Sequence, residues 1–156
     1  MQKFVALTNQ NVRMPDMPLG PVEYLIVGFP GNKFTGKIAP ELKALVDSGT
    51  VRVLDLVFIG KDVDGSVVVF EVDELEGVAE FAEMDADVGG LIGDSDVAHA
   101  AASLEPNSSC ALLIWEDVWA AQFAEAVRSS GGVLLEGARI PYELIAPALE
   151  SLPAAV

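Results

Sequence analysis

The segment from Gly31 to Ile38 is the part of this sequence that comes nearest to a motif with known chemistry. It reads Gly-Asn-Lys-Phe-Thr-Gly-Lys-Ile and fits the phosphate-binding pattern G-x-x-x-x-G-K-[ST] at every place but the last. Ser or Thr at that place would hold magnesium, and the alkyl side chain of Ile38 cannot. Nucleotide hydrolysis is therefore not expected, although the stretch 111–117 superficially resembles the carboxylate-bearing strand of nucleotide hydrolases.

The same segment can bind a small anion or a nucleotide without hydrolysing it. It lies between an expected strand and an expected helix, and N–H groups at a helix N-terminus attract anions. The candidate site consists of Gly31, Asn32, Lys33, Thr35, Gly36 and Lys37. The alternative is an ordinary glycine-bearing turn.

The stretch from Asp62 to Glu125 contains 16 acidic residues and no basic residue. Such a stretch can bind divalent metal or a basic protein partner, or can simply be a solvated surface. No histidine or cysteine lies at ligand spacing among these carboxylates, so the solvated surface is favoured and no metal or cofactor is expected. Asp62-Val63-Asp64-Gly65 partly fits a calcium loop, but expected strands on both sides indicate a hairpin turn.

Catalysis is not expected, because the chain offers no complete set of nucleophile and base. The only histidine, His99, lies on an alanine-rich helix without an identifiable serine or cysteine partner. The only cysteine, Cys110, lies in an apolar strand, which favours a buried, inert thiol. Trp115 and Trp119 are four residues apart beside Glu116 and Asp117, and they could anchor a partner or fill the core equally well.

The elements that would position these residues can be read from apolar runs, helical spacing and turn residues. Strands are predicted at 22–29, 51–59, 66–72, 109–115 and 133–140. Helices are predicted at 37–47, 118–129 and 142–151, and in two pieces within 73–104, the second starting at an N-cap Asp94 or Ser95. Residues 1–20 read as a flexible N-terminal tail and 21–156 as a single domain.

This order of elements predicts an α+β fold. The first six elements, β-α-β-β-α-β, match the ferredoxin-like or split β-α-β arrangement, and a C-terminal β-α unit follows. A longer Rossmann-type sheet is the alternative, but the Asp-Gly hairpin interrupts its strict alternation of strand and helix.

Charge narrows the classes of partner. The 156 residues include 24 acidic and 9 basic ones, for a formal net charge of −15. Nucleic acid and anionic membrane surfaces would be repelled. No apolar run approaches the roughly 20 residues of a membrane span, and a single cysteine suits a reducing compartment. A cytoplasmic location is expected.

Several short stretches together resemble an uncharacterised, mostly actinobacterial family of small acidic proteins, catalogued as a domain of unknown function. The resemblance covers essentially residues 17–152. It is carried by Gly20–Leu25, Phe29–Asn32, Phe34–Gly36, Ile38–Pro40, Val51–Val57, Val88–Leu91 and Trp115–Asp117. The family is similar to small bacterial proteins with a glycine-rich helical insert, some of them membrane-associated, and residues 89–93 would correspond to the remnant of that insert. The acidic residues that flank this remnant oppose membrane insertion here.

Two functions of different classes follow. The first is a non-enzymatic interaction protein that self-associates, as a dimer, through a face or edge of its sheet. The alternative is a binder of small anions or nucleotides that uses Gly31–Lys37.

Overall fold

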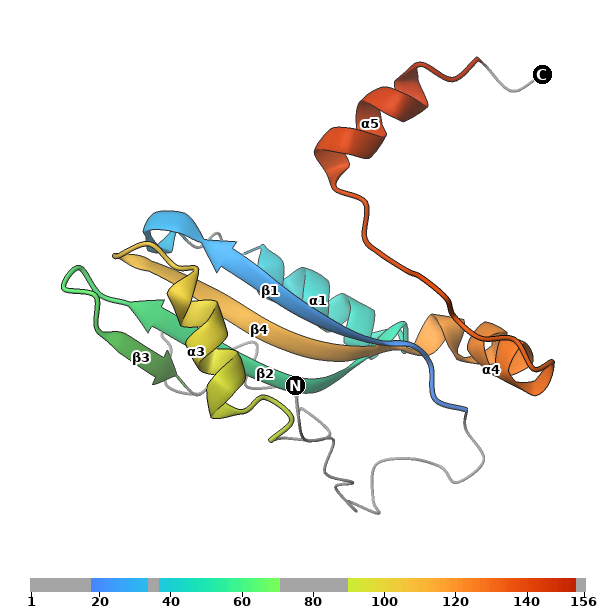
Figure 1. The fold of residues 1–156 in the computed structure, drawn as a ribbon, viewed down its shortest axis with the longest axis horizontal. Coiled ribbons are helices and arrows are strands. Elements are labelled where there is room, and N and C mark those ends of the chain that lie inside the picture. The colour runs from blue at the N-terminus through green and yellow to red at the C-terminus, as the bar shows by residue number, and fades with distance from the viewer. Residues whose placement is uncertain (1–17, 34–36, 71–89, 154–156) are drawn as a thin grey trace. The chain divides into compact units, whose positions relative to one another are not determined.

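The chain divides into two compact units, residues 1–126 and residues 127–156. We call them the sheet unit and the C-terminal unit. The sequence predicts a single domain over residues 21–156. The structure, a computed structural model, describes residues 18–33, 37–70 and 90–153 (Figure 1).

The sheet unit is built on four antiparallel strands in the order β1-β4-β2-β3. They are β1 (Val22–Phe29), β2 (Val51–Lys61), β3 (Val67–Phe70) and β4 (Ser108–Asp117). Their positions confirm four predicted strands, although β2 and β4 are longer than expected. β1 is parallel to β2 and is separated from it by β4, which pairs with both.

Two helices cover opposite faces of this sheet (Figure 1). They are α1 (Ile38–Asp47) and α3 (Asp94–Ala102). Side chains alternate along β4, as they must along any strand. Leu113 therefore packs with Leu42 on one face, which we call the α1 face, and Leu112 packs with Ala100 on the other, the α3 face. The α+β class is thus confirmed, and the ferredoxin-like arrangement stays a prediction.

The hairpin between β2 and β3 confirms the turn predicted at Asp62–Gly65. The Gly65 N–H donates to the Asp62 carbonyl, and Gly65 has φ +87°, a conformation that favours glycine. The Asp64 carboxylate accepts hydrogen bonds from the N–H and the hydroxyl of Ser66. These bonds lower the pKa of Asp64.

Two helix starts differ from the prediction. The N-cap of α3 is Gly93, and the Asp96 carboxylate accepts its N–H, so neither Asp94 nor Ser95 caps this helix. The helix predicted at 118–129 begins as a 3-10 turn, η3 (Val118–Ala120), and continues as α4 (Ala121–Ser129). The first predicted helical piece within 73–104 lies mainly outside the described residues.

The predicted fifth strand at Val133–Ile140 is wrong for a single chain. The described part of the C-terminal unit contains no strand, and its remaining helix is α5 (Tyr142–Glu150). A strand is stable only when another strand pairs with its N–H and C=O groups. Residues 133–140 have strand-forming side chains, and the described part of their own unit supplies no second strand.

Candidate functional site

The predicted anion loop begins with a 3-10 turn, η1 (Pro30–Asn32), directly after β1. Gly31 and Asn32 both have left-handed backbone conformations, with φ +67° and +58°. The Gly31 N–H donates to Ser108 Oγ at 3.2 Å, and Asn32 Nδ2 donates to Asn107 Oδ1 at 3.2 Å. Two donors of the expected site are therefore bonded to the first residue of β4 and to the residue before it.

The remaining residues of the predicted anion site are only partly described. Lys33 and Lys37 are exposed, and Lys37 is the N-cap of α1 without a side-chain hydrogen bond to the helix. Thr35 and Gly36 lie outside the described residues. The structure thus brings Gly31 and Asn32 against β4, and it does not show the six predicted residues gathered around one point.

A cavity of about 210 Å³ lies beside Asn32, which the sequence does not predict. Phe58 and Phe70 provide apolar walls, and Ser109 also lines it. The Ser109 hydroxyl is fully buried and is the only such side-chain polar atom without a hydrogen-bond partner among the described residues. Buried hydroxyls are normally paired, so this one marks the cavity as a place to look for a ligand or an ordered water.

The aromatic pair Trp115 and Trp119 is placed in two different environments. Trp115 lies in β4, packs against the α1-face core, and donates its indole N–H to Glu23 Oε2 at 2.7 Å. Trp119 lies in η3 and is 71% exposed. Only Trp119 therefore presents most of its ring as a surface that a partner could contact.

A buried ion pair lies at the end of β4, where the sequence shows only a run of acidic residues. Glu116 is 2% exposed, and its Oε1 accepts hydrogen bonds from Arg52 Nε at 3.0 Å and Nη2 at 2.8 Å. Its Oε2 accepts the Gly20 N–H at 2.7 Å. Both carboxylate oxygens are thus engaged, which indicates a structural role for Glu116.

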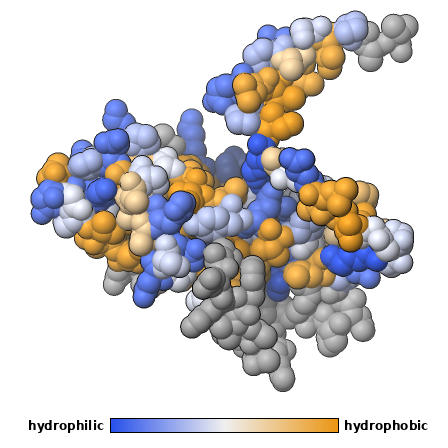
Figure 2. Space-filling view, in the orientation of Figure 1, coloured by the Kyte–Doolittle hydropathy of each residue, from blue (hydrophilic) through white to orange (hydrophobic). Residues whose placement is uncertain are grey.

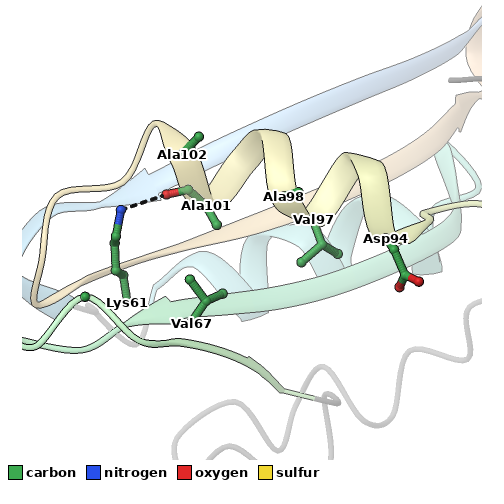
Figure 3. Close-up of a pocket in the computed structure, with 8 residues that line it drawn as sticks. Lys61, Val67, Asp94, Val97, Ala98, Ala101 and Ala102 are labelled. Atoms are coloured by element: carbon green, nitrogen blue, oxygen red, sulfur yellow. Dashed lines mark hydrogen bonds between the residues drawn. The ribbon is translucent and has the colours of Figure 1, made fainter.

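An open groove of about 520 Å³ runs between α3 and the β2–β3 hairpin (Figure 3). Its walls are small and apolar, with Val67 on one side and Val97 and Ala98 on the other. Lys61 closes one end by donating from Nζ to the carbonyls of Ala101 at 3.2 Å and Leu104 at 3.1 Å. Its ammonium group is therefore used to cap α3.

The other reactive residue types are either covered or isolated. Cys110 is fully buried on the α3 face, and desolvation raises the pKa of its thiol, as expected for an inert cysteine. His99 is exposed on α3. No group of three or more His, Cys, Asp or Glu side chains in the described part of the chain is arranged to hold a metal ion.

A row of apolar side chains is partly exposed along β1. Val22, Tyr24 and Ile26 alternate along the strand and are 37–43% exposed. Tyr24 and Ile26 pair with Ile114 and Leu112, which places them on the α3 face beyond the cover of the helix. In the described part of the chain, β4 is the only strand that pairs with β1, and no described strand pairs with the other edge of β1.

Over residues 18–156 the sequence matches a family of unknown function. The chain belongs to the DUF6325 family. This membership confirms the resemblance to a domain of unknown function and brings no activity with it. No curated protein and no solved structure matches the chain. None of the helices described in this DUF6325 protein has the length and hydropathy that crossing a lipid bilayer requires.

The DUF6325 match begins just before Gly20, which the sequence predicts to lie in a flexible tail. A Cβ at Gly20 would collide with the Asp117 carbonyl, so only glycine lets the chain pass this close to β4. The Asp117 N–H also donates to the Pro21 carbonyl at 2.7 Å. The Gly20-Pro21 pair directly before a strand is the sequence signal for this close approach. The hydrogen-bond partner of Gly20 is Glu116, 96 residues later, and spacing along the chain does not predict such a distant pairing.

Proposed function

We propose that this DUF6325 protein is a non-enzymatic interaction protein that self-associates as a dimer. The edge of β1 that faces away from β4, with which no described strand pairs, carries the proposal. Natural sheets protect long edges with lysine, proline, bulges or a covering element, because open N–H and C=O groups recruit further strands.

β1 has none of these sequence protections. Its eight residues contain no lysine and no proline, and its pairing with β4 runs without a bulge from Val22 to Phe29. An unprotected apolar edge in a protein of net charge −15 is best explained as a surface that is covered when the protein functions.

The wider setting of the proposal follows from composition and family. We place the protein in the cytoplasm, with a ferredoxin-like core, in a family of small acidic and mostly actinobacterial proteins. The single buried cysteine supports a reducing compartment, and the negative charge disfavours nucleic acid and anionic lipid. The same charge leaves a basic protein as a further partner, and the exposed carboxylates of Asp62, Asp64 and Asp94 within the acidic stretch 62–125 are available to it.

Sedimentation equilibrium of the full chain tests self-association. At tens of micromolar protein, an interface of ordinary affinity should give about twice the monomer mass of 16.4 kDa. A strictly monomeric protein across this range, at physiological salt, would remove the proposal.

Binding of a small polar ligand is the second candidate function, favoured by the buried Ser109 hydroxyl beside Asn32. A thermal-shift screen with phosphate, nucleotides and divalent metals tests it. A ligand at about 100 times its dissociation constant should stabilise the protein by roughly 2.7 kcal/mol. Ser109→Ala should remove that shift, whereas Ser103→Ala, whose hydroxyl bonds the Ala100 carbonyl at 2.8 Å, should retain it. No shift with any compound would reject this candidate.

A further inference from the structure

The C-terminal unit leaves an unusual amount of apolar side chain in water. Eight of its large hydrophobic residues are 58–91% exposed: Val133, Leu134, Leu135, Ile140, Tyr142, Leu144, Leu149 and Leu152. Figure 2 shows hydrophobic side chains gathered along α5. Soluble proteins rarely expose contiguous apolar surface of this kind unless it binds something.

Charge sets this unit apart from the rest of the chain. Residues 127–156 hold two basic and three acidic residues, for a net charge of −1. Residues 1–126 hold seven basic and 21 acidic residues, for a net charge of −14. Contact between two sheet units would bring like charges together, whereas the C-terminal unit can approach a second copy with little repulsion.

Residues 133–140 have the sequence of a strand without the structure of one. They are bounded by Gly131-Gly132 and by Pro141. Five of the eight residues are apolar, and three of these are consecutive, Val133-Leu134-Leu135. Their length of eight residues equals that of β1. The described residues therefore include both a strand-forming segment without a partner strand and a sheet edge with which no other described strand pairs.

We propose that Val133–Ile140 of one copy adds to the edge of β1 that faces away from β4 in a second copy. The proposal rests on the proposed self-association and names its contact surfaces. A second copy is the occupant because each copy supplies both complementary elements, so a two-fold exchange makes the same contact twice. Main-chain hydrogen bonds would supply affinity, as in other cases of strand addition. The Gly131-Gly132 pair provides a connection that can adjust its backbone.

Proline substitutions in the full chain test the strand pairing. Leu134→Pro and Leu135→Pro each remove one N–H, and because alternate residues face the neighbouring strand, at least one lies in the ladder. We expect the variant whose N–H lies in the ladder to raise the dimer dissociation constant at least about tenfold, equivalent to 1.4 kcal/mol. Both positions are exposed coil, so the sheet unit should retain its circular dichroism spectrum.

Val63→Pro is the matched control. Val63 is 80% exposed and is the second residue of the Asp62–Gly65 turn, a position that favours proline. This variant should dimerise like the parent protein. If Leu134→Pro and Leu135→Pro both dimerise like the parent protein, the strand-addition proposal is overturned, whereas the proposed self-association stands.

Cross-linking identifies which chain supplies the strand. The double variant Tyr24→Cys/Leu135→Cys places one thiol on β1 and one in the segment, while Cys110 stays fully buried. A short bismaleimide should give a covalent dimer on a denaturing gel, and neither single variant should do so to the same extent. A cross-link only within single chains would overturn the second copy as the occupant. A monomeric parent protein would overturn both the proposed function and this inference.

Discussion

Glu116 shows how a surface-type residue becomes structural when its partners are distant in sequence. Its carboxylate joins Arg52 on β2 to the N–H of Gly20, which precedes β1, so one side chain connects three strands of the sheet. A carboxylate at 2% exposure is tolerated because both oxygens accept hydrogen bonds and a guanidinium neutralises the charge.

We predict that Glu116→Gln lowers the free energy of unfolding by about 2–3 kcal/mol. Glutamine has one acceptor oxygen, and its amide NH₂ would face either Arg52 or the Gly20 N–H, both of which are donors. Urea denaturation measures the loss. Lys43→Gln is the control, because the Lys43–Asp47 pair is exposed and its removal should change stability by no more than about 0.5 kcal/mol. Equal effects of the two variants would contradict the structural role of Glu116.

Cys110 provides a pH-dependent prediction. Burial raises the pKa of its thiol above the ordinary value of 9.0, so the folded state favours the neutral thiol. Its contribution to stability is therefore complete below pH 9 and is lost as the pH rises beyond it. Tyr24, whose pKa is also raised, mainly by desolvation, acts in the same direction above pH 10. We expect the free energy of unfolding to fall less steeply above pH 9 in Cys110→Ala than in the parent protein. Identical slopes would show that the thiol does not contribute.

At the scale of elements, α3 is attached to the sheet at both of its ends. Before the helix, the Ile92 N–H donates to Asp55 Oδ2 at 2.9 Å, next to an irregularity in the β2–β4 register. At its C-terminal end, Lys61 bonds the carbonyls of Ala101 and Leu104. Few large side chains hold the nine-residue helix, because the residues that it buries are Ala100 and Ala101. These polar contacts therefore position it.

We predict that Lys61→Met loosens the end of α3 and destabilises the protein by about 1 kcal/mol. Methionine retains the apolar stem and removes the charge and the donors that satisfy the two carbonyls. Amide hydrogen exchange should become faster in the last turn of α3. Exchange rates that stay unchanged in the rest of the protein would localise the effect to this helix end. Lys33→Met, at an exposed lysine, should leave these amides unchanged. Unaltered exchange in Lys61→Met would contradict the capping role.

At the scale of the whole molecule, charge opposes compactness and association. The net charge of −15 is concentrated in residues 1–126. Such self-repulsion keeps a protein soluble and destabilises its folded state.

We predict that salt raises both the melting temperature and the affinity of self-association. Increasing NaCl from about 10 mM to 0.15 M shortens the Debye length from about 30 Å to 8 Å, which screens the repulsion between carboxylates. Scanning calorimetry and sedimentation at the two concentrations measure the effects. Choline chloride should act like NaCl, because screening does not depend on the identity of the cation. A response to only one of the salts would indicate specific ion binding in place of screening.

Local sequence patterns sufficed where an element depends on its own residues. The apolar run of β1 predicted its bounds at both ends, and the Asp62–Gly65 turn followed from its Asp-Gly pair. Helix starts were less predictable, because Gly93 caps α3 through a bond to the Asp96 side chain. For the candidate site, the sequence indicated Gly31 and Asn32, but the cavity beside Asn32 depends on residues from three strands.

The sequence by itself determined the class of fold, the acidity, the buried cysteine and the positions of four strands, because these depend on composition and on neighbours along the chain. Only the tertiary structure decided that β4 lies between β1 and β2, that Glu116 pairs with Arg52, and that Val133–Ile140 forms no strand within one chain. Each of these outcomes depends on a pairing between residues far apart in sequence. Apolar periodicity can show that a segment is able to form a strand, but whether it does so depends on a neighbouring strand whose N–H and C=O groups are available to it.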